Sequence, residues 1–246
     1  MRAALSAELR KVRATPTIWW LLLGTVAIGV VGTIAPLIAD RETADLMTDR
    51  QLQQALHGAA AGATLVIIAG IIGMAGEWRF GQATQTFLST PRRQRVVAAK
   101  CITYMGLGAV YGVAAGLAAA VSAWTWYRSN DLTLPLDRSA VWLTLLGCCS
   151  VAVAFGLIGV AIGAVVRNQV GAIVGTLAWH ILVEPALFHA SPTVFRWLPG
   201  MASFSLRRQP VDDLLSVGPA AAVLIGYAGV LLAGGFWRVE RSDVTA

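Results

Sequence analysis

Two residues of this sequence have the types and the spacing for proton chemistry inside an apolar segment. His180 and Glu184 lie four positions apart in WHILVEPAL, so a helix would place both side chains on one face, one turn apart. An ionisable side chain within a lipid-embedded helix costs at least about 2.5 kcal/mol and normally faces protein or a water-filled path. The pair therefore predicts either a shared proton along such a path or a structural hydrogen bond that holds the outer end of its helix.

Other constellations that carry chemistry are missing from the sequence. It has no GxxxxGK[ST] phosphate loop, no HExxH metal motif and no GxSxG nucleophile elbow. The three histidines are not spaced as a metal set, and the three cysteines lie within apolar runs, as small buried side chains do. We therefore expect no catalytic residue, no metal site and no cofactor bound by this chain.

The elements that position these residues are apolar helices. The 246 residues are 57% hydrophobic and 13% charged, which is about half the charged share of soluble domains. A membrane protein needs fewer charges because lipid solvates its outer face, and about 20 apolar residues form a helix that crosses the bilayer. The sequence predicts an all-α polytopic membrane protein with a single domain over 1–246. Its six spans are expected at about 17–39, 56–76, 98–126, 139–166, 168–187 and 216–237.

The basic residues predict how these spans are oriented. Six spans place both termini on one side of the membrane, and Lys and Arg are enriched in cytoplasmic segments. Twelve of the 19 basic residues fall on the side of the N-terminus. We therefore expect both termini to be cytoplasmic, and the net charge of +6 requires no nucleic-acid partner.

Small residues at four-residue spacing predict close helix packing in lipid. This spacing relates Gly108, Gly112 and Gly116 on the third span, Gly58 and Gly62 on the second, and Gly171 and Gly175 on the fifth. It fits packing within the chain or an interface between subunits.

A polar block separates the second and third predicted spans. Residues 77–100 read EWRFGQATQTFLSTPRRQRVVAAK, whereas about two to six residues would join two antiparallel helices. Thr84, Phe87 and Leu88 lie at helical spacing and would share one face of a short helix that Pro91 ends. Such a helix would either anchor the loop at the membrane surface or fill a groove on a cytosolic protein.

In their order along the chain, these motifs resemble the type-2 permease subunits of ATP-binding-cassette exporters, especially small six-span actinobacterial ones. The loop of that family reads roughly E-x-R-x-G, a coupling helix, P-R-R-x-R and an Ala-Lys pair. The matching residues here are Glu77, Arg79, Gly81, Pro91, Arg92, Arg93, Arg95, Ala99 and Lys100. ELRKVRATPTIWWLL resembles the amphipathic elbow helix of the family, and WHILVEPAL with RWLPG resembles its fifth span and outer re-entrant segment. Two positions depart from the family pattern, because Phe80 replaces a common histidine and Gln82 a threonine.

The resemblance implies a permease in the bacterial plasma membrane that exports an amphipathic substrate such as a drug, a peptide or a lipid-like molecule. Two separate ATPase subunits, which bind ATP and Mg, would dock on this chain and on a second permease, either a copy or a homologue. It also implies an elbow helix over 1–16, a cytoplasmic coupling loop over 77–97 and an outer loop over 188–215.

The residue roles that the resemblance implies fall into two groups. Coupling to the ATPase is expected from Glu77, Arg79, Gly81, Thr84, Phe87, Leu88 and Pro91. Contact with lipid headgroups or anchoring of the loop is expected from Arg10, Lys11, Arg13, Arg92, Arg93, Arg95 and Lys100, with Leu5, Leu9 and Val12 of the elbow helix facing lipid.

Two other functions remain open at the level of sequence. An ion-coupled secondary transporter would usually show inverted repeats and helices broken near midplane, and Pro185 is a residue that could interrupt a span. A non-transporting membrane assembly factor is the other alternative. Purification of the chain with its natural partners distinguishes the three, because an associated ATPase supports only the exporter.

Overall fold

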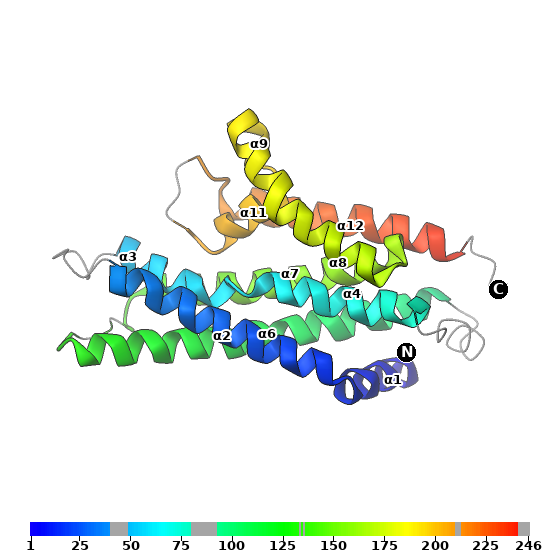
Figure 1. The fold of residues 1–246 in the computed structure, drawn as a ribbon, viewed down its shortest axis with the longest axis horizontal. Coiled ribbons are helices and arrows are strands. Elements are labelled where there is room, and N and C mark those ends of the chain that lie inside the picture. The colour runs from blue at the N-terminus through cyan, green and yellow to red at the C-terminus, as the bar shows by residue number, and fades with distance from the viewer. Residues whose placement is uncertain (40–48, 80–92, 133, 135, 210–212, 241–246) are drawn as a thin grey trace.

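The computed structural model describes residues 1–39, 49–79, 93–132, 134, 136–209 and 213–240, and most of these residues are helical (Figure 1). Six helices are long and apolar enough to cross a bilayer, and they are Pro16–Ala39, Leu52–Arg79, Gln94–Ser129, Ser139–Val166, Gln169–Leu187 and Val217–Arg238. The predicted all-α fold of a polytopic membrane protein is therefore confirmed.

The second and fifth of these helices are composite. In chain order the elements are α1 (Arg2–Ala14), α2 (Pro16–Ala39), α3 (Asp49–Leu56), the 3-10 turn η1 (His57–Ala60), α4 (Ala63–Arg79), α6 (Arg93–Ser129), α7 (Ser139–Val166), α8 (Gln169–Ala178), the π-helical turn η2 (Trp179–Val183), α9 (Glu184–Ala190), α10 (Pro192–Phe195), α11 (Pro199–Leu206) and α12 (Val217–Glu240). The second span combines α3, η1 and α4, and the fifth combines α8, η2 and α9.

Local residue chemistry explains where several helices end. Thr15 is extended because the residue before a proline disfavours helical geometry, and Pro16 then starts α2. Arg167 takes a left-handed conformation with φ 58 and ends α7. Asn168 caps α8, since its side-chain oxygen accepts a hydrogen bond from the Gly171 N–H at 2.9 Å. These two breaks place α1 at an angle to α2 and reverse the chain between α7 and α8.

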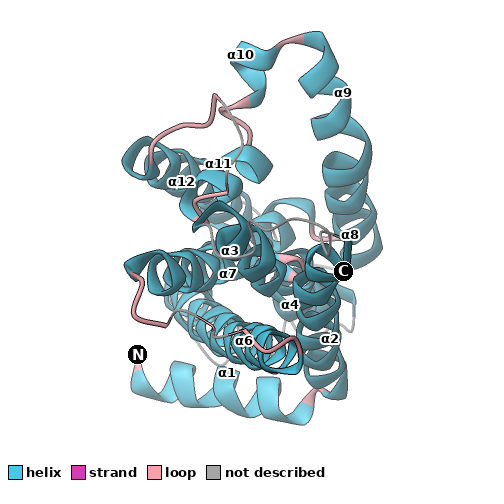
Figure 2. Ribbon diagram, turned by 90° about the vertical axis from the view of Figure 1, so that its left-hand side faces the viewer, coloured by secondary structure: helices cyan, strands magenta, loops and turns pink. Residues whose placement is uncertain are grey.

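The helix α1 lies across one end of the bundle, and the C-terminal end of α12 reaches the same end (Figures 1 and 2). On α1, Glu8 and Val12 are buried on the side that packs against α6, whereas Leu9 is 43% exposed. The expectation that Val12 faces lipid is therefore wrong. Residues one turn apart share a helix face, so the contact that buries Glu8 also buries Val12.

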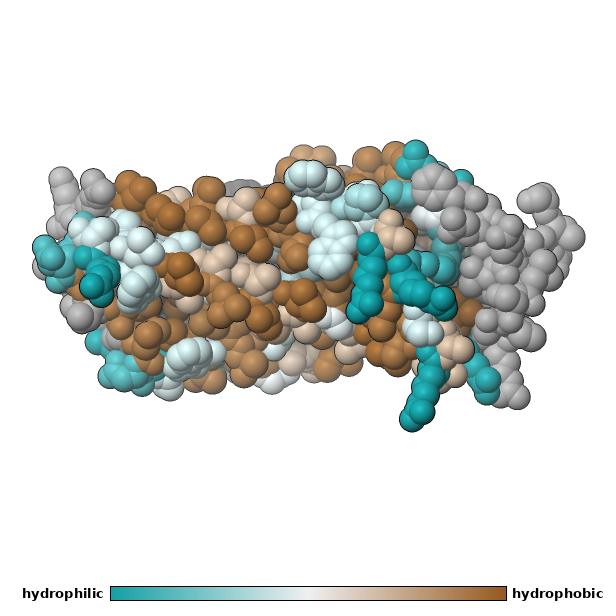
Figure 3. All heavy atoms as spheres, turned by 90° about the horizontal axis from the view of Figure 1, so that it is seen from below, coloured by the Kyte–Doolittle hydropathy of each residue, from teal (hydrophilic) through white to brown (hydrophobic). Residues whose placement is uncertain are grey.

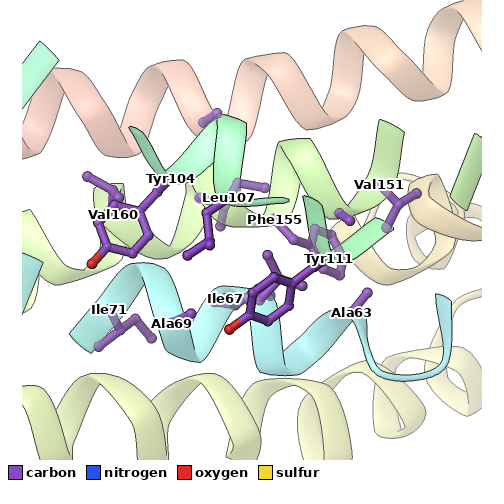
Figure 4. Close-up of a cluster of buried hydrophobic side chains, with 14 of the residues drawn as sticks. Ala63, Ile67, Ala69, Ile71, Tyr104, Leu107, Tyr111, Val151, Phe155 and Val160 are labelled. Carbon is purple, nitrogen blue, oxygen red and sulfur yellow. The ribbon is translucent and has the colours of Figure 1, made fainter. Parts of the chain in front are cut away.

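The core lies around α7, which packs against α4, α6 and α12. Figure 4 shows part of this core, with Ile67 and Ile71 from α4, Tyr104 and Tyr111 from α6, and Phe155 from α7. Glycines let these backbones approach closely.

The glycine spacing serves packing within the chain on two of the three spans. A Cβ added at Gly112 would lie 2.7 Å from Cys149 Cα, and one at Gly62 would lie 2.7 Å from Thr25 Cα. On the fifth span, by contrast, no atom of the described residues lies within 4 Å of a Cβ added at Gly175. The spacing on that span leaves space beside the helix instead of a backbone contact.

The outer surface of the bundle is apolar. Figure 3 shows apolar side chains across the middle of one face and hydrophilic ones toward its two ends. Many large apolar side chains of the bundle are exposed, for example Trp20 at 70%, Ile225 at 71% and Val230 at 74%. A surface of this kind requires lipid around it, because water would solvate it poorly.

Candidate functional site

Four charged side chains meet where α1 crosses the bundle. We call Glu8, Lys11, Glu77 and Lys100 the ion-pair cluster. The Lys100 ammonium donates to Glu8 Oε2 at 2.7 Å and to Glu77 Oε1 at 2.8 Å. The Lys11 ammonium donates to Glu8 Oε1 at 2.9 Å and to Glu77 Oε1 at 2.5 Å. The cluster thereby connects α1, α4 and α6, which are far apart in sequence.

The two ammonium and two carboxylate groups of the ion-pair cluster balance in charge, and most of the cluster is buried. The side chain of Lys100 is 1% exposed, and a third hydrogen bond from its ammonium to the Gly73 carbonyl at 2.9 Å uses its last N–H donor. The side chain of Lys11 is 40% exposed, so it completes the cluster at the surface. Burial lowers the pKa of Lys11, but the hydrogen bonds with Glu77 and Glu8 outweigh it and raise the pKa above its usual value. Both carboxylates therefore have cationic partners, as buried charges require.

The ion-pair cluster holds the two helices that flank residues 80–92. Glu77 lies one half-turn before the end of α4 at Arg79, and Lys100 lies two turns after the start of α6. Lys100 was expected to anchor the loop or to contact lipid headgroups. Its ammonium is buried and bound to three protein acceptors, so it does not contact headgroups. Lys11, by contrast, binds the carboxylates of the cluster and is also partly exposed at the surface.

The remaining predicted residues of this region are at the surface or outside the described residues. Arg10, Arg13, Arg79 and Arg95 are exposed, and Arg10 Nε donates to the Ser6 carbonyl within α1. Arg93 begins α6, but its side chain is not described. The residues that lie outside the described part of the chain are Gly81, Thr84, Phe87, Leu88, Pro91 and Arg92.

The predicted polar pair forms on the fifth span. His180 Nδ1 lies 3.2 Å from Glu184 Oε2, and Glu184 Oε1 accepts hydrogen bonds from Trp179 Nε1 at 2.9 Å and from the Gly200 N–H at 3.1 Å. The carboxylate thus joins α9 to the first turn of α11 and lies at the positive end of that short helix. Of the two interpretations of the pair, a shared proton or a structural hydrogen bond, the contact between Glu184 and Gly200 is the structural hydrogen bond.

The sequence around this contact explains its geometry. The Glu184 N–H bonds to the Trp179 carbonyl, which closes the π-helical turn just before Pro185. Pro199 occupies the first turn of α11, and Gly200 leaves the room that the carboxylate fills, because an added Cβ would collide with it. A π-helical turn inside an α-helix frequently marks a functional segment.

Two cavities lie beside this polar pair. The first, which we call the apolar pocket, has a volume of about 300 Å³ and lies between the fifth and sixth spans over α7. Its walls include Ala172 and Trp179 on one side, Tyr227 and Leu231 on the other, and Ile158 below. The pocket is almost wholly apolar, so it suits a hydrocarbon group.

The second cavity, which we call the polar chamber, has a volume of about 490 Å³. Its walls come from α2, α3, η1, α4, α7, η2, α9 and α11 and from residues next to these elements. His180 and Phe155 line both cavities, with their rings 6.1 Å apart between centroids. The two cavities are therefore neighbours, one apolar and one polar.

Sequence reasoning missed three residues of these sites. Glu8 is an ion-pair cluster member, and its spacing of three from Lys11 was the available signal. Arg207 is 7% exposed, lines the polar chamber and follows the apolar run MASFSL, so its position after that run was a second signal. His57 also lines the chamber, but a single histidine in an apolar segment carries no specific signal.

The contacts of Glu184 lead to a prediction about stability. Glu184→Gln retains an oxygen that accepts the Gly200 and Trp179 hydrogen bonds, so we expect thermal unfolding close to that of the wild type. Glu184→Ala leaves the buried Gly200 N–H and the part-buried Trp179 Nε1 without their acceptor, which should lower the free energy of unfolding by about 1–3 kcal/mol. Tryptophan fluorescence during heating of the detergent-purified protein measures both.

Equal stability of the two Glu184 variants would contradict the structural hydrogen bond. Loss of activity in Glu184→Gln, with stability kept, would instead indicate that the charge itself has a role.

The described residues contain no group of three or more His, Cys, Asp and Glu side chains arranged to hold a metal ion. Comparison of the chain with protein-family models and with curated proteins finds no match.

Proposed function

We propose that this chain is the membrane-spanning permease subunit of an ATP-driven exporter of the ATP-binding-cassette class, in the bacterial plasma membrane. Separate ATPase subunits bind ATP and Mg and dock on residues 81–90 from the cytoplasm. A second permease, either a copy or a homologue, completes the complex. The substrate is amphipathic, in keeping with an apolar pocket that adjoins a polar chamber.

The observation that carries this proposal is the ion-pair cluster. A loop that receives force from an ATPase must pass it to the spans, which requires that the helix ends on both sides of the loop move as one unit. Lys100 binds the carboxylates of Glu8 and Glu77 together, so buried charged contacts link α1 to the ends of α4 and α6 that flank residues 80–92 in the sequence. Breaking a buried ion pair is costly, and the link is correspondingly stiff.

Co-purification tests the proposal. The chain, extracted from its native membrane in a mild detergent, should carry an ATP-binding-cassette ATPase with it, and the purified complex should hydrolyse ATP. A chain that purifies without any nucleotide-hydrolysing subunit, yet transports in response to an ion gradient, would overturn the proposal.

The fifth span supports a second candidate, an ion-coupled secondary transporter. Its π-helical turn interrupts the α-helix beside the His180–Glu184 pair, and interrupted helices with ionisable side chains line ion paths in such proteins. This candidate predicts transport that collapses when the proton gradient is dissipated and that is indifferent to ATP depletion. The exporter predicts the reverse dependence.

The proposed orientation leads to a separate prediction. In a cysteine-free background, Asp45→Cys should react with an impermeant maleimide added to intact cells, because residue 45 is expected outside. Gln94→Cys should react only after the membrane is permeabilised, because residue 94 is expected in the cytoplasm. The excess of basic residues on the N-terminal side is the physical reason. Labelling in the reverse order would contradict the orientation.

A further inference from the structure

The polar chamber holds a buried cation without an anionic partner among the described residues. Arg207 is 7% exposed, and its guanidinium has five N–H donors. Nε donates to the Ser203 carbonyl at 3.2 Å and Nη2 to Ser203 Oγ at 3.3 Å, while the plane lies over the Phe204 ring at 4.5 Å. These contacts position the group but do not neutralise it. Burial lowers the pKa of Arg207 to about 10, so the guanidinium remains charged at neutral pH.

A second residue of the chamber has buried polar atoms without a partner. His57 is 7% exposed, and neither of its ring nitrogens makes a hydrogen bond with the described residues. Buried polar side-chain atoms are nearly always hydrogen-bonded, so such a group calls for a partner that is not part of the chain. Because His57 and Arg207 come from different elements and line one cavity, a single ligand can contact both.

The sign of the missing charge follows from Glu184 on the other wall. Its carboxylate already has three partners, namely Trp179 Nε1, His180 Nδ1 and the Gly200 N–H. The negative group of the chamber is therefore satisfied by its neighbours, whereas the positive group is not. A ligand that completes the chamber has to bring an anion.

The apolar pocket indicates what accompanies that anion. It shares Phe155 and His180 with the chamber, and its remaining walls are mostly apolar side chains of α4, α7, α11 and the fifth and sixth spans. A molecule with its anionic group at Arg207 therefore has an apolar space directly beside it. The fifth and sixth spans are, with the first, the least buried of the six, so the pocket lies near the outer surface of the bundle.

We propose that the polar chamber binds the anionic group, a carboxylate or a phosphate ester, of an amphipathic molecule whose hydrocarbon part occupies the apolar pocket. Arg207 supplies the positive charge and His57 an N–H donor. That this molecule is the exported substrate rests on the proposed function, whereas the binding itself does not.

Binding of radiolabelled dodecyl phosphate tests the proposal, with the chain held in nanodiscs of phosphatidylcholine and no ATPase present. We expect saturable binding that excess unlabelled dodecyl phosphate displaces, and that dodecanol or inorganic phosphate alone at the same concentration does not. Arg207→Gln should weaken binding by roughly tenfold or more, because a charge-assisted hydrogen bond is lost. Arg208→Gln is the matched control, since Arg208 is the exposed neighbour outside the chamber, and it should bind as the wild type does.

A second variant keeps the test decisive if Arg207→Gln fails to fold. His57→Leu removes polar atoms that have no partner in the described chain, so it should unfold no earlier than the wild type and yet bind dodecyl phosphate more weakly. The ligand can be a lipid of the bilayer or a free amphiphile, and nanodiscs that contain phosphatidylglycerol distinguish the two. If phosphatidylglycerol competes with dodecyl phosphate, the ligand is a bilayer lipid; if it does not compete, the ligand is a free amphiphile.

Absence of saturable binding, equal displacement by dodecanol, or unchanged affinity in both chamber variants would overturn the anion site. The capture of an ATPase by this chain is measured separately and would be unaffected by that result. Conversely, a chain that binds dodecyl phosphate through Arg207 but captures no ATPase would retain the anion site and lose the exporter.

Discussion

Lys100→Met should lower the thermal stability of this protein more than any single surface substitution. Removal of the ammonium leaves Glu8 and Glu77 buried and facing each other, with only the half-exposed Lys11 to compensate them. Breaking a buried ion pair typically costs about 3–5 kcal/mol. For a chain of this size, such a loss corresponds to a fall of roughly 6–20 °C in the unfolding midpoint. Tryptophan fluorescence during heating in detergent measures it.

Two further variants show whether charge balance is the cause. Arg95→Met removes a basic residue of the same helix that is exposed, so its unfolding free energy should change by no more than about 0.5 kcal/mol. Adding Glu8→Gln to Lys100→Met leaves one carboxylate with Lys11, and part of the lost stability should return. If Arg95→Met and Lys100→Met destabilise the protein equally, the ion-pair cluster has no special role.

The architecture could be predicted from the sequence because lipid imposes simple requirements on it. A membrane span needs an uninterrupted apolar run of sufficient length, and such runs are visible without knowledge of packing. The six helices follow from that requirement. The interruption of the fifth span was visible as Pro185, but the sequence alone did not indicate that the turn before it would be π-helical.

The functional sites could be predicted only where both partners lie close in sequence. His180 and Glu184 are one helical turn apart, so their contact followed from helical spacing alone. The partners of Lys100 come from α1 and α4, and no local pattern relates these segments to α6. A lysine that follows Val96, Val97 and two alanines, and precedes another apolar run, did signal burial. Its position after the arginines favoured the headgroups instead.

The polar chamber was beyond prediction for the same reason. Arg207 and His57 are brought together by the way α11 folds back between the fifth and sixth spans. That return depends on the contact of Glu184 with Gly200, which joins residues sixteen positions apart. Only the three-dimensional arrangement shows that one carboxylate is satisfied while one guanidinium is not.

Phe87→Ala should release the ATPase from a permease that remains folded. Residues 81–90 are proposed to insert as a helix into a cleft of the ATPase, with Phe87 and Leu88 as buried anchors. Truncation of such an anchor typically costs about 2 kcal/mol or more, which corresponds to roughly thirtyfold weaker binding. The unfolding midpoint should stay at the wild-type value, because Phe87 is proposed to contact the partner and not the core.

Neutralisation of the neighbouring arginines is the matched control. Arg92, Arg93 and Arg95 are proposed to contact anionic headgroups, each worth about 1 kcal/mol near the membrane surface. The triple change to glutamine should therefore disturb orientation or lipid contact more than ATPase capture. Loss of capture by the triple variant alone would assign the docking surface to the arginines instead.

Co-purification of the ATPase with wild-type and Phe87→Ala chains, followed by ATP hydrolysis of each complex, tests the exporter most directly. We expect the wild type to retain an ATPase and to hydrolyse ATP. We expect Phe87→Ala to insert normally into the membrane but to lose the bound ATPase or its stimulation. Full capture and full stimulation in Phe87→Ala would contradict it, and residues 81–90 would then be an anchor at the membrane surface.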